Sequence, residues 1–112
     1  MKATIEELDG GITRIVLDGR MDIEGSQAID LRMNVIAGSA RLVLVDLAGV
    51  TFLGSMGLGS IVRPAQAIRR RGGKMVLLNP IPLVQEVLRN AHIDTIIPIH
   101  NDLDAALAEL RA

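Results

Sequence analysis

The chain has no cysteine, no tryptophan, no tyrosine and a single phenylalanine, Phe52. Without cysteine it can form no disulfide, no thiolate nucleophile and no cysteine-ligated metal site. Without a set of aromatic side chains it lacks the platforms on which single-stranded nucleic acids stack. Any core must therefore be built from aliphatic side chains, with methionine as adaptable filler.

The sequence also has no excess of one charge and no long apolar run. Its formal net charge is −1, which argues against the basic surface of a nucleic-acid-binding protein. The first ten residues, MKATIEELDG, carry charges where a signal peptide has an apolar stretch. No run approaches the roughly 18–20 apolar residues of a membrane span. We therefore expect a cytoplasmic protein that binds no nucleic acid and does not insert into a membrane.

What the chain does have is aliphatic surface to bury, because 49% of its 112 residues are hydrophobic. That length suits one domain and is too short for two. Alternating or continuous apolar runs predict strands at 2–7, 12–18, 41–47, 74–78 and 94–99. Apolar residues at helical spacing predict helices at 27–38, 55–71, 81–91 and from about 102 to the end.

The order of these elements, ββαβαβαβα, predicts one α/β domain over residues 1–112, with a mostly parallel sheet packed with helices. Ser26 is expected to cap the helix at 27–38. Pro64 is expected to kink or split the helix at 55–71, and Pro98 places the last strand at an edge. Strand-to-helix loops gather at one edge of such a sheet, which would bring together Asp22, Ser55 and Asn79.

Residues 54–60, GSMGLGS, pose the question of nucleotide binding. Their glycines follow G-x-x-G-x-G, whereas the dinucleotide fingerprint is G-x-G-x-x-G and depends on that order. Gly54 and Gly59 have P-loop spacing, but Ser60 stands where the P-loop has its lysine. No acidic residue occurs from Thr51 to Gln85 to hold a ribose. We therefore expect neither a nucleotide nor any other cofactor.

The same stretch presents a serine at the start of a helix. In the structural interpretation Ser55 is an N-cap, with a bond to a backbone N–H that contributes about 1 kcal/mol. In the functional interpretation a phosphate on this serine would face free N–H groups and the positive end of the helix dipole. Such a site controls the binding of a partner and is not a catalytic centre.

Four nearby residues are expected opposite the buried stripe of this helix: Met56, Gly59, Ser60 and Arg63. They form either a docking face or ordinary exposed surface. His92 and His100 are isolated, and no pair of His or acidic residues has the spacing of a metal motif. We expect no metal site and no enzymatic activity.

The segment LVLVDLAGVTFLGSMGLGSI, at 42–61, resembles the signature of STAS domains, a family that includes the bacterial anti-sigma factor antagonists. GRMD at 19–22 and GGKMVLLNP at 72–80 are similar to further family segments. The resemblance implies that Ser55 is the phosphoacceptor. Asp22 and Asp46 match acidic positions of the family close to that serine, and Gly57, Leu58 and Gly59 match the G-L-G that begins its helix. Adding the residues placed by their helix position, we expect a partner-binding surface made of Asp22, Asp46, Gly54, Met56, Gly57, Gly59, Ser60 and Arg63.

The resemblance further implies a partner and its regulation. Family members bind an anti-sigma factor that is also a serine kinase of the histidine-kinase-like ATPase fold. Phosphorylation of the serine ends this interaction, and a phosphatase restores it. The chain departs from the family at Gly54, where an acid is usual, and at Met56, where a serine or threonine is usual. These departures leave open a second interpretation, a non-phosphorylated STAS module that holds a signalling or transport complex together.

Overall fold

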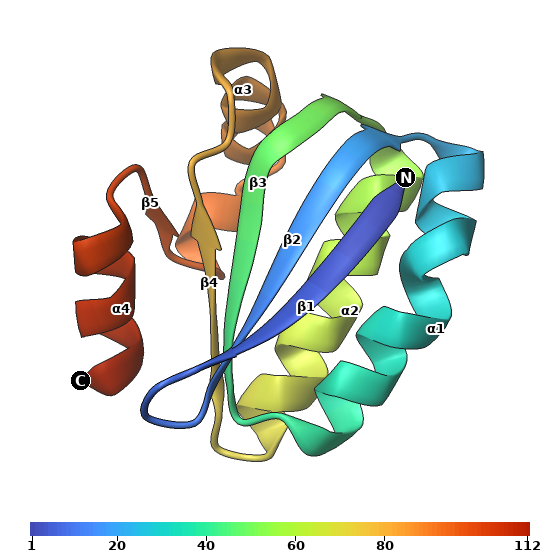
Figure 1. Cartoon of the computed structure of the whole chain (residues 1–112). Coiled ribbons are helices and arrows are strands. Elements are labelled where there is room, and N and C mark those ends of the chain that lie inside the picture. The colour runs from blue at the N-terminus through green and yellow to red at the C-terminus, as the bar shows by residue number, and fades with distance from the viewer.

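The computed structural model describes all 112 residues and confirms the predicted α/β domain, with five strands and four α-helices (Figure 1). The elements are β1 (Lys2–Leu8), β2 (Ile12–Met21), α1 (Ile23–Ser39), β3 (Leu42–Leu53), α2 (Ser55–Arg70), β4 (Lys74–Leu78), α3 (Pro82–Asn90), the 3₁₀ turn η1 (Ile93–Thr95), β5 (Ile99–His100) and α4 (Leu103–Arg111).

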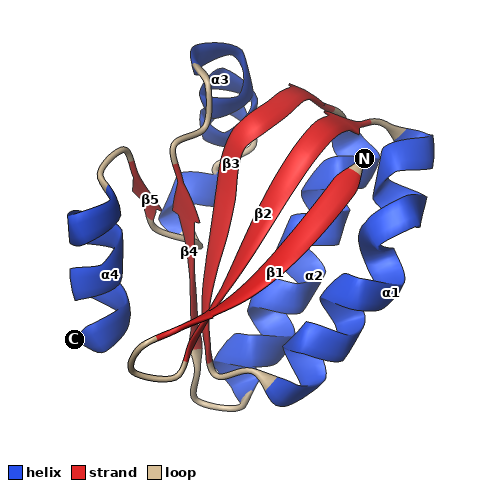
Figure 2. Ribbon diagram, in the orientation of Figure 1, coloured by secondary structure: helices blue, strands red, loops and turns tan.

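The strands lie in the sheet in chain order, from β1 to β5. Strand β1 pairs with β2 in the antiparallel sense, and the other neighbours are parallel. Because the strands advance in one direction, right-handed crossovers bring α1, α2 and α3 to the same face. Helix α4 follows the last strand and lies on the other face (Figure 2).

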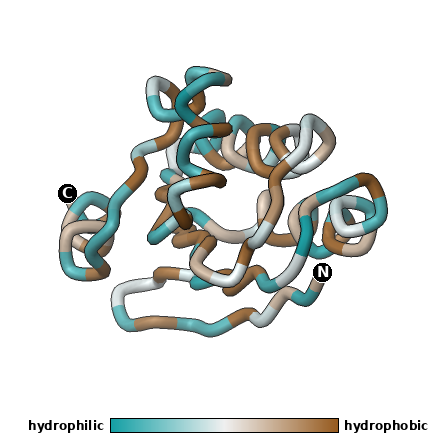
Figure 3. Tube along the Cα trace, turned by 90° about the horizontal axis from the view of Figure 1, so that it is seen from above, coloured by the Kyte–Doolittle hydropathy of each residue, from teal (hydrophilic) through white to brown (hydrophobic).

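Two aliphatic clusters hold these layers together. The larger one joins the sheet to α1, α2 and α3, with Ile29 and Met33 from α1, Ile61 and Ile68 from α2, and Val84 from α3. The smaller one lies beneath α4 and contains Ile12, Leu44, Val76, Leu78, Ala106 and Leu110. Figure 3 shows hydrophobic segments among the central strands and their helices and more hydrophilic ones in the outer turns. Neither cluster contains Phe52.

Strands β2 and β3 are longer than predicted. Residues 19–21 and 48–53 were expected in loops, but they extend the two strands until Met21 pairs with Leu53. The register shifts twice, opposite Val16–Asp18 and opposite Gly19–Arg20, where β3 has one residue more than β2. The extension moves the start of α2 well beyond the end of β4, which stops opposite Asp46.

Helix α1 starts earlier than predicted, because Asp22 and not Ser26 is its N-cap. The Asp22 carboxylate accepts a hydrogen bond from the backbone N–H of Gly25 at 2.8 Å. Ser26 is fully buried inside the helix. An aspartate directly after a strand can cap the first turn that follows, so the helix begins at once.

The expected strand at 94–99 is mostly wrong. The chain forms η1 and then a strand of only two residues, Ile99 and His100. Ile97 is buried in the larger cluster without extended pairing, which explains the apolar pattern of this segment. Pro64 does not split α2, which runs through it without interruption. The proline is buried against the rest of the fold, and this packing offsets the lost backbone donor.

Candidate functional site

The N-terminal ends of α1 and α2 lie side by side, where β2 and β3 finish together (Figure 1). The backbone N–H of Gly54 donates a 3.1 Å hydrogen bond to the carbonyl of Met21. Asp22 follows Met21 and Ser55 follows Gly54, so two of the predicted site residues meet at this edge. The third, Asn79, does not join them, because it follows the much shorter β4.

The sequence suggested that Ser55 is the N-cap of α2. In the structure Ser55 is instead the first residue of the helix. Gly54 is the cap, with extended backbone angles and no side chain to close the first turn. The Ser55 side chain is exposed. The first turn of α2 contains no acidic residue, and no side chain caps its free N–H groups.

Replacing Ser55 by alanine should therefore change the free energy of unfolding by less than about 0.5 kcal/mol. The loss of about 1 kcal/mol that a cap would give is not expected. Urea unfolding of the two proteins checks this. A clear loss in Ser55→Ala would mean that the hydroxyl makes a structural bond after all.

Asp22 carries a charge at the same sheet edge as Ser55. Its pKa is lowered below the ordinary 3.8, first by the hydrogen bond from the Gly25 N–H and then by the Arg20 side chain. The Arg20 Nε lies 3.5 Å from Asp22 Oδ2. The carboxylate thus remains ionised beside the start of α2 at neutral pH, while it organises the start of α1.

Asp22→Asn tests this assignment, because asparagine is an equally good cap without the charge. A lowered folded-state pKa stabilises the protein above the unfolded value of 3.8, and this stabilisation is lost as the pH falls through the folded pKa. Wild type should be the more stable protein at neutral pH, and the difference should shrink in acid. Unfolding measured over a pH series would contradict the assignment if the difference stayed constant.

Gly57 is buried and lets the first turn of α2 lie directly on the sheet. A Cβ at this position would come within 2.7 Å of Leu53 Cδ1 and 2.8 Å of Met21 Cβ and of the Met21 carbonyl oxygen. The physical role of this glycine is close approach between helix and sheet. Its contribution to a partner surface is indirect, because it sets where Ser55 and Met56 lie.

The expected exposure of Ser60 is wrong, because only 1% of this residue is exposed. Its hydroxyl lies 2.6 Å from Asp30 Oδ1 on α1, a geometry in which it donates a hydrogen bond. Arg63 also approaches Asp30, with its guanidinium 3.9 Å from Oδ1. Ser60 therefore joins α2 to α1, and its side chain is not part of the exposed face. The sequence offered no signal for Asp30, because a single acid on a helix has no distinctive pattern.

Asp46 is also not beside Ser55. It lies about 20 Å back along β3 and is 7% exposed. Its carboxylate forms an ion pair with Arg14 at 2.6 Å and accepts a bond from the Ala48 N–H. Alternation along the strand places Asp46 on the same face as Leu44, the face that α4 partly covers. Its role is to pair with Arg14 within the sheet.

Two features near Ser55 were missed from the sequence. The first is Arg20, whose guanidinium lies over the Phe52 ring at 4.5 Å from its centroid. The second is the outer face of α1, where Ile23, Leu31 and Val35 are 63%, 75% and 62% exposed. Met56 of α2 is also exposed, at 44%. Ile23 and Met56 lie in the first turns of their helices, whereas Leu31 and Val35 lie about 12 and 18 Å further along α1. The pairing of Arg20 with Phe52 depends on strand register and has no local signal.

No three His, Asp or Glu side chains gather in a metal-binding arrangement. None of the helices combines the length and the apolar character needed to cross a membrane. The edge presents the exposed Ser55, the N-terminus of α2 and the charges of Asp22 and Arg20. This arrangement is suited to modification and binding.

Comparison with known proteins agrees on one family. The model of the STAS domain matches residues 4–106. BtrV of Bordetella bronchiseptica, which its name assigns provisionally to the anti-sigma factor antagonists, is 29% identical over 99% of this chain and 96% of its own length.

Two solved structures share the fold. An anti-sigma factor antagonist from Mycobacterium paratuberculosis superposes with a TM-score of 0.88 at 24% identity, over 99% of this chain and 94% of that one. The Bacillus cell fate determinant SpoIIAA in its phosphorylated form has a TM-score of 0.72 at 18% identity, over 93% and 96% of the two chains.

Proposed function

Because the chain belongs to the STAS domain family, we propose that it is an anti-sigma factor antagonist whose binding is switched off by phosphorylation of Ser55. The observation that carries this proposal is the exposed serine hydroxyl at the first position of α2, next to an uncapped turn. A kinase can reach such a hydroxyl without unfolding any element. The protein itself acts by binding and is the substrate of an enzyme.

The surroundings of Ser55 can accept a phosphate. The modification adds about −1.5 to −2 charges at neutral pH, and both the helix dipole and the free N–H groups of the first turn favour an anion there. The first turn of α2 contains no acid, and the nearby Asp22 carboxylate is paired with Arg20. The fold should therefore persist, while a partner docked over the serine meets a new charge that it must desolvate.

The proposed docking surface comprises the exposed apolar residues of α1 and α2, together with Ser55 and Arg63. Ile23 and Met56 lie in the first turns of the two helices, so an apolar partner patch centred there would cover the serine. Asp22, Gly54 and Gly59 shape its edge. Buried Ser60 and Asp46 are outside it.

The partner we propose is an anti-sigma factor that is also a serine kinase of the histidine-kinase-like ATPase fold, opposed by a phosphatase. The relatives named as anti-sigma factor antagonists support an anti-sigma factor as the partner. SpoIIAA, solved in a phosphorylated form, shows that this fold can carry the modification in another protein. The kinase class comes from the resemblance alone.

Affinity capture from the native host tests the proposal with wild type, Ser55→Ala and Ser55→Glu as baits. Wild type and Ser55→Ala should retain the kinase, and Ser55→Glu should bind it about 100-fold more weakly. The bound partner would bury the new carboxylate without a counter-charge, which costs several kcal/mol of binding free energy. Gln66→Glu is the matched control: it adds the same charge to an exposed site about three turns further along α2 and should bind like wild type.

The contrary result identifies the alternative function. If every bait retains the same transporter or scaffold protein and no kinase, the chain is a non-phosphorylated STAS module. Gly54, which stands in place of the usual acid before the serine, is the feature that favours this second candidate. Equal loss of the kinase from Ser55→Glu and Gln66→Glu would show a general charge effect instead of a switch at Ser55.

A further inference from the structure

One half of β4 has no strand on its outer side. β5 pairs only with the last two residues of β4, Leu77 and Leu78. The Leu77 N–H donates to the Pro98 carbonyl at 2.9 Å, and before Pro98 the chain turns away as η1. The sheet edge beside Met75 is therefore left open.

Backbone alternation shows which groups face this opening. The Lys74 N–H bonds to the Arg41 carbonyl on the side of β3, whereas the N–H groups of Leu77 and Asn79 bond to the segment of β5. In a parallel strand the N–H and C=O of every second residue point to the same side. The N–H and C=O of Met75 thus point towards β5, where no strand meets them.

A hollow of about 310 Å³ lies against this edge. Its volume falls at the lower end of the roughly 300–1,000 Å³ of small-molecule sites. One wall is the last part of α2, with Gln66 and Arg69, and the other is the chain from Thr95 to Pro98. Glu109 of α4 closes one side. Ile97 is 2% exposed and Ile96 is 41% exposed. The lining of the hollow therefore includes both a buried and an exposed isoleucine.

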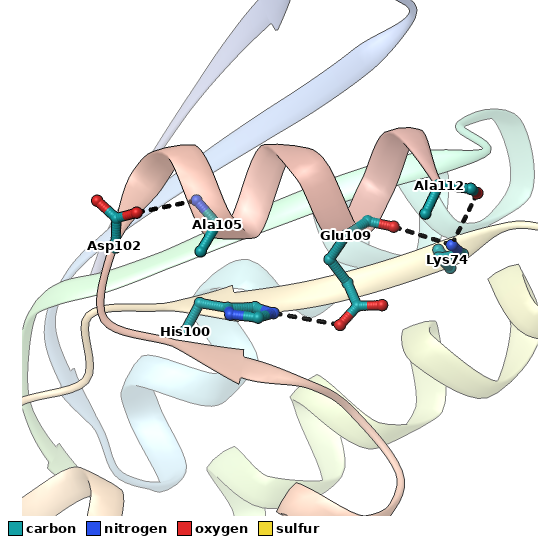
Figure 4. Close-up of polar contacts among 6 residues, drawn as sticks. All are labelled: Lys74, His100, Asp102, Ala105, Glu109 and Ala112. Atoms are coloured by element: carbon teal, nitrogen blue, oxygen red, sulfur yellow. Dashed lines mark hydrogen bonds and ion pairs between the residues drawn. The ribbon is translucent and has the colours of Figure 1, made fainter.

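The charged groups of the hollow are not equally available. Lys74 Nζ donates to the carbonyls of Glu109 and Ala112, at 2.9 and 3.1 Å, and Glu109 Oε1 lies 3.2 Å from His100 Nε2 (Figure 4). Arg69 is exposed and has no carboxylate within ion-pair distance. Arg69 and Lys74 together with Glu109 give the lining a net charge of +1, which suits a singly charged anion better than a phosphate dianion.

We propose that this hollow binds a small monocarboxylate with a short apolar chain. The carboxylate lies between the Met75 N–H and the Arg69 guanidinium, and the chain lies against Ile97 and Pro98. A carboxylate that accepts one backbone and one guanidinium hydrogen bond satisfies both donors. A peptide added as a strand is less suited, because only one residue of β4 offers free backbone groups. The site is about 20 Å from Ser55, at the other end of α2.

Titration of the ¹⁵N-labelled protein with hexanoate tests the proposal by amide chemical shifts. Saturable shifts are expected at Met75, Ile97 and Arg69, with none at Ser55. Arg69→Gln should weaken binding at least about tenfold, as expected for loss of a charged hydrogen bond. The matched control is Arg70→Gln, a neighbouring exposed arginine that does not line the hollow, and it should bind hexanoate like wild type. Hexylamine, with the same chain and the opposite charge, should give no saturable shift.

Three results would overturn the proposal. The first is the absence of saturable shifts with hexanoate up to about 10 mM, above the millimolar dissociation constant typical of so small a ligand. The second is equal weakening by Arg69→Gln and Arg70→Gln, which would indicate general attraction of anions. The third is saturation by hexylamine or tighter binding of inorganic phosphate, either of which would contradict the assigned ligand charge. Phosphorylation of Ser55 plays no part in these measurements.

Discussion

Replacing Gly57 with valine should lower the free energy of unfolding by about 3 kcal/mol, the upper part of the range for overpacked sites. The new Cβ would meet Leu53 Cδ1 and the Met21 backbone carbonyl at less than 3 Å. That carbonyl already accepts the hydrogen bond of Gly54, so neither the strand end nor the helix start can move without losing it. Urea unfolding gives the difference directly.

Gly38→Val is the matched control for this substitution. Gly38 also lies in a helix, but a Cβ there would have no neighbour within 4 Å. Its stability should stay within about 0.5 kcal/mol of wild type, because valine and glycine differ little in an exposed helix end. If the two variants were equally stable, close packing at Gly57 would not be the reason for its glycine. A folded Gly57→Val protein should also bind its partner more weakly, since the start of α2 is displaced.

The second large effect is expected at the ion pair between Arg14 and Asp46. Arg14→Met should lower the free energy of unfolding by about 2 kcal/mol, because it leaves a buried carboxylate without its partner. The value is below that of a fully buried pair, since the Arg14 side chain is 25% exposed whereas that of Asp46 is 9% exposed. Denaturant unfolding measures the loss.

A double-mutant cycle separates pairing from packing. Asp46→Leu combined with Arg14→Met removes both charges, and the double variant should recover most of the stability lost by Arg14→Met alone. If the two losses simply add, the pair has no coupling energy and Asp46 must be held by other contacts. Partner affinity should be the same in all these variants that fold, because Asp46 lies outside the proposed docking surface.

The two serines of GSMGLGS show where prediction from the sequence worked and where it did not. Hydrophobic periodicity correctly predicted that a helix begins here, because the buried stripe depends only on residue spacing. It could not decide that Gly54 is the cap, since capping depends on the backbone angles at the end of β3. Nor could it show that Ser60 is buried, because that follows from the approach of Asp30 from another helix.

The strands give the same lesson. Continuous apolar runs predicted β3 and β4 but not the length of β3, which extends because β2 continues beside it to Met21. The last strand was overestimated because Ile96 and Ile97 carry the apolar pattern of a strand but lie in a turn. Burial and extended structure leave a similar signature in a short segment.

The sequence by itself thus determined the α/β alternation, the aliphatic core and the presence of a serine at the start of a helix. These properties depend on composition and on the spacing of nearby residues. The tertiary structure alone decided that Ser55 is free while Ser60 is bonded to Asp30, that Asp46 pairs with Arg14, and that one edge of β4 stays open. Each of these depends on which distant segment packs against the residue, and local spacing carries no record of that neighbour.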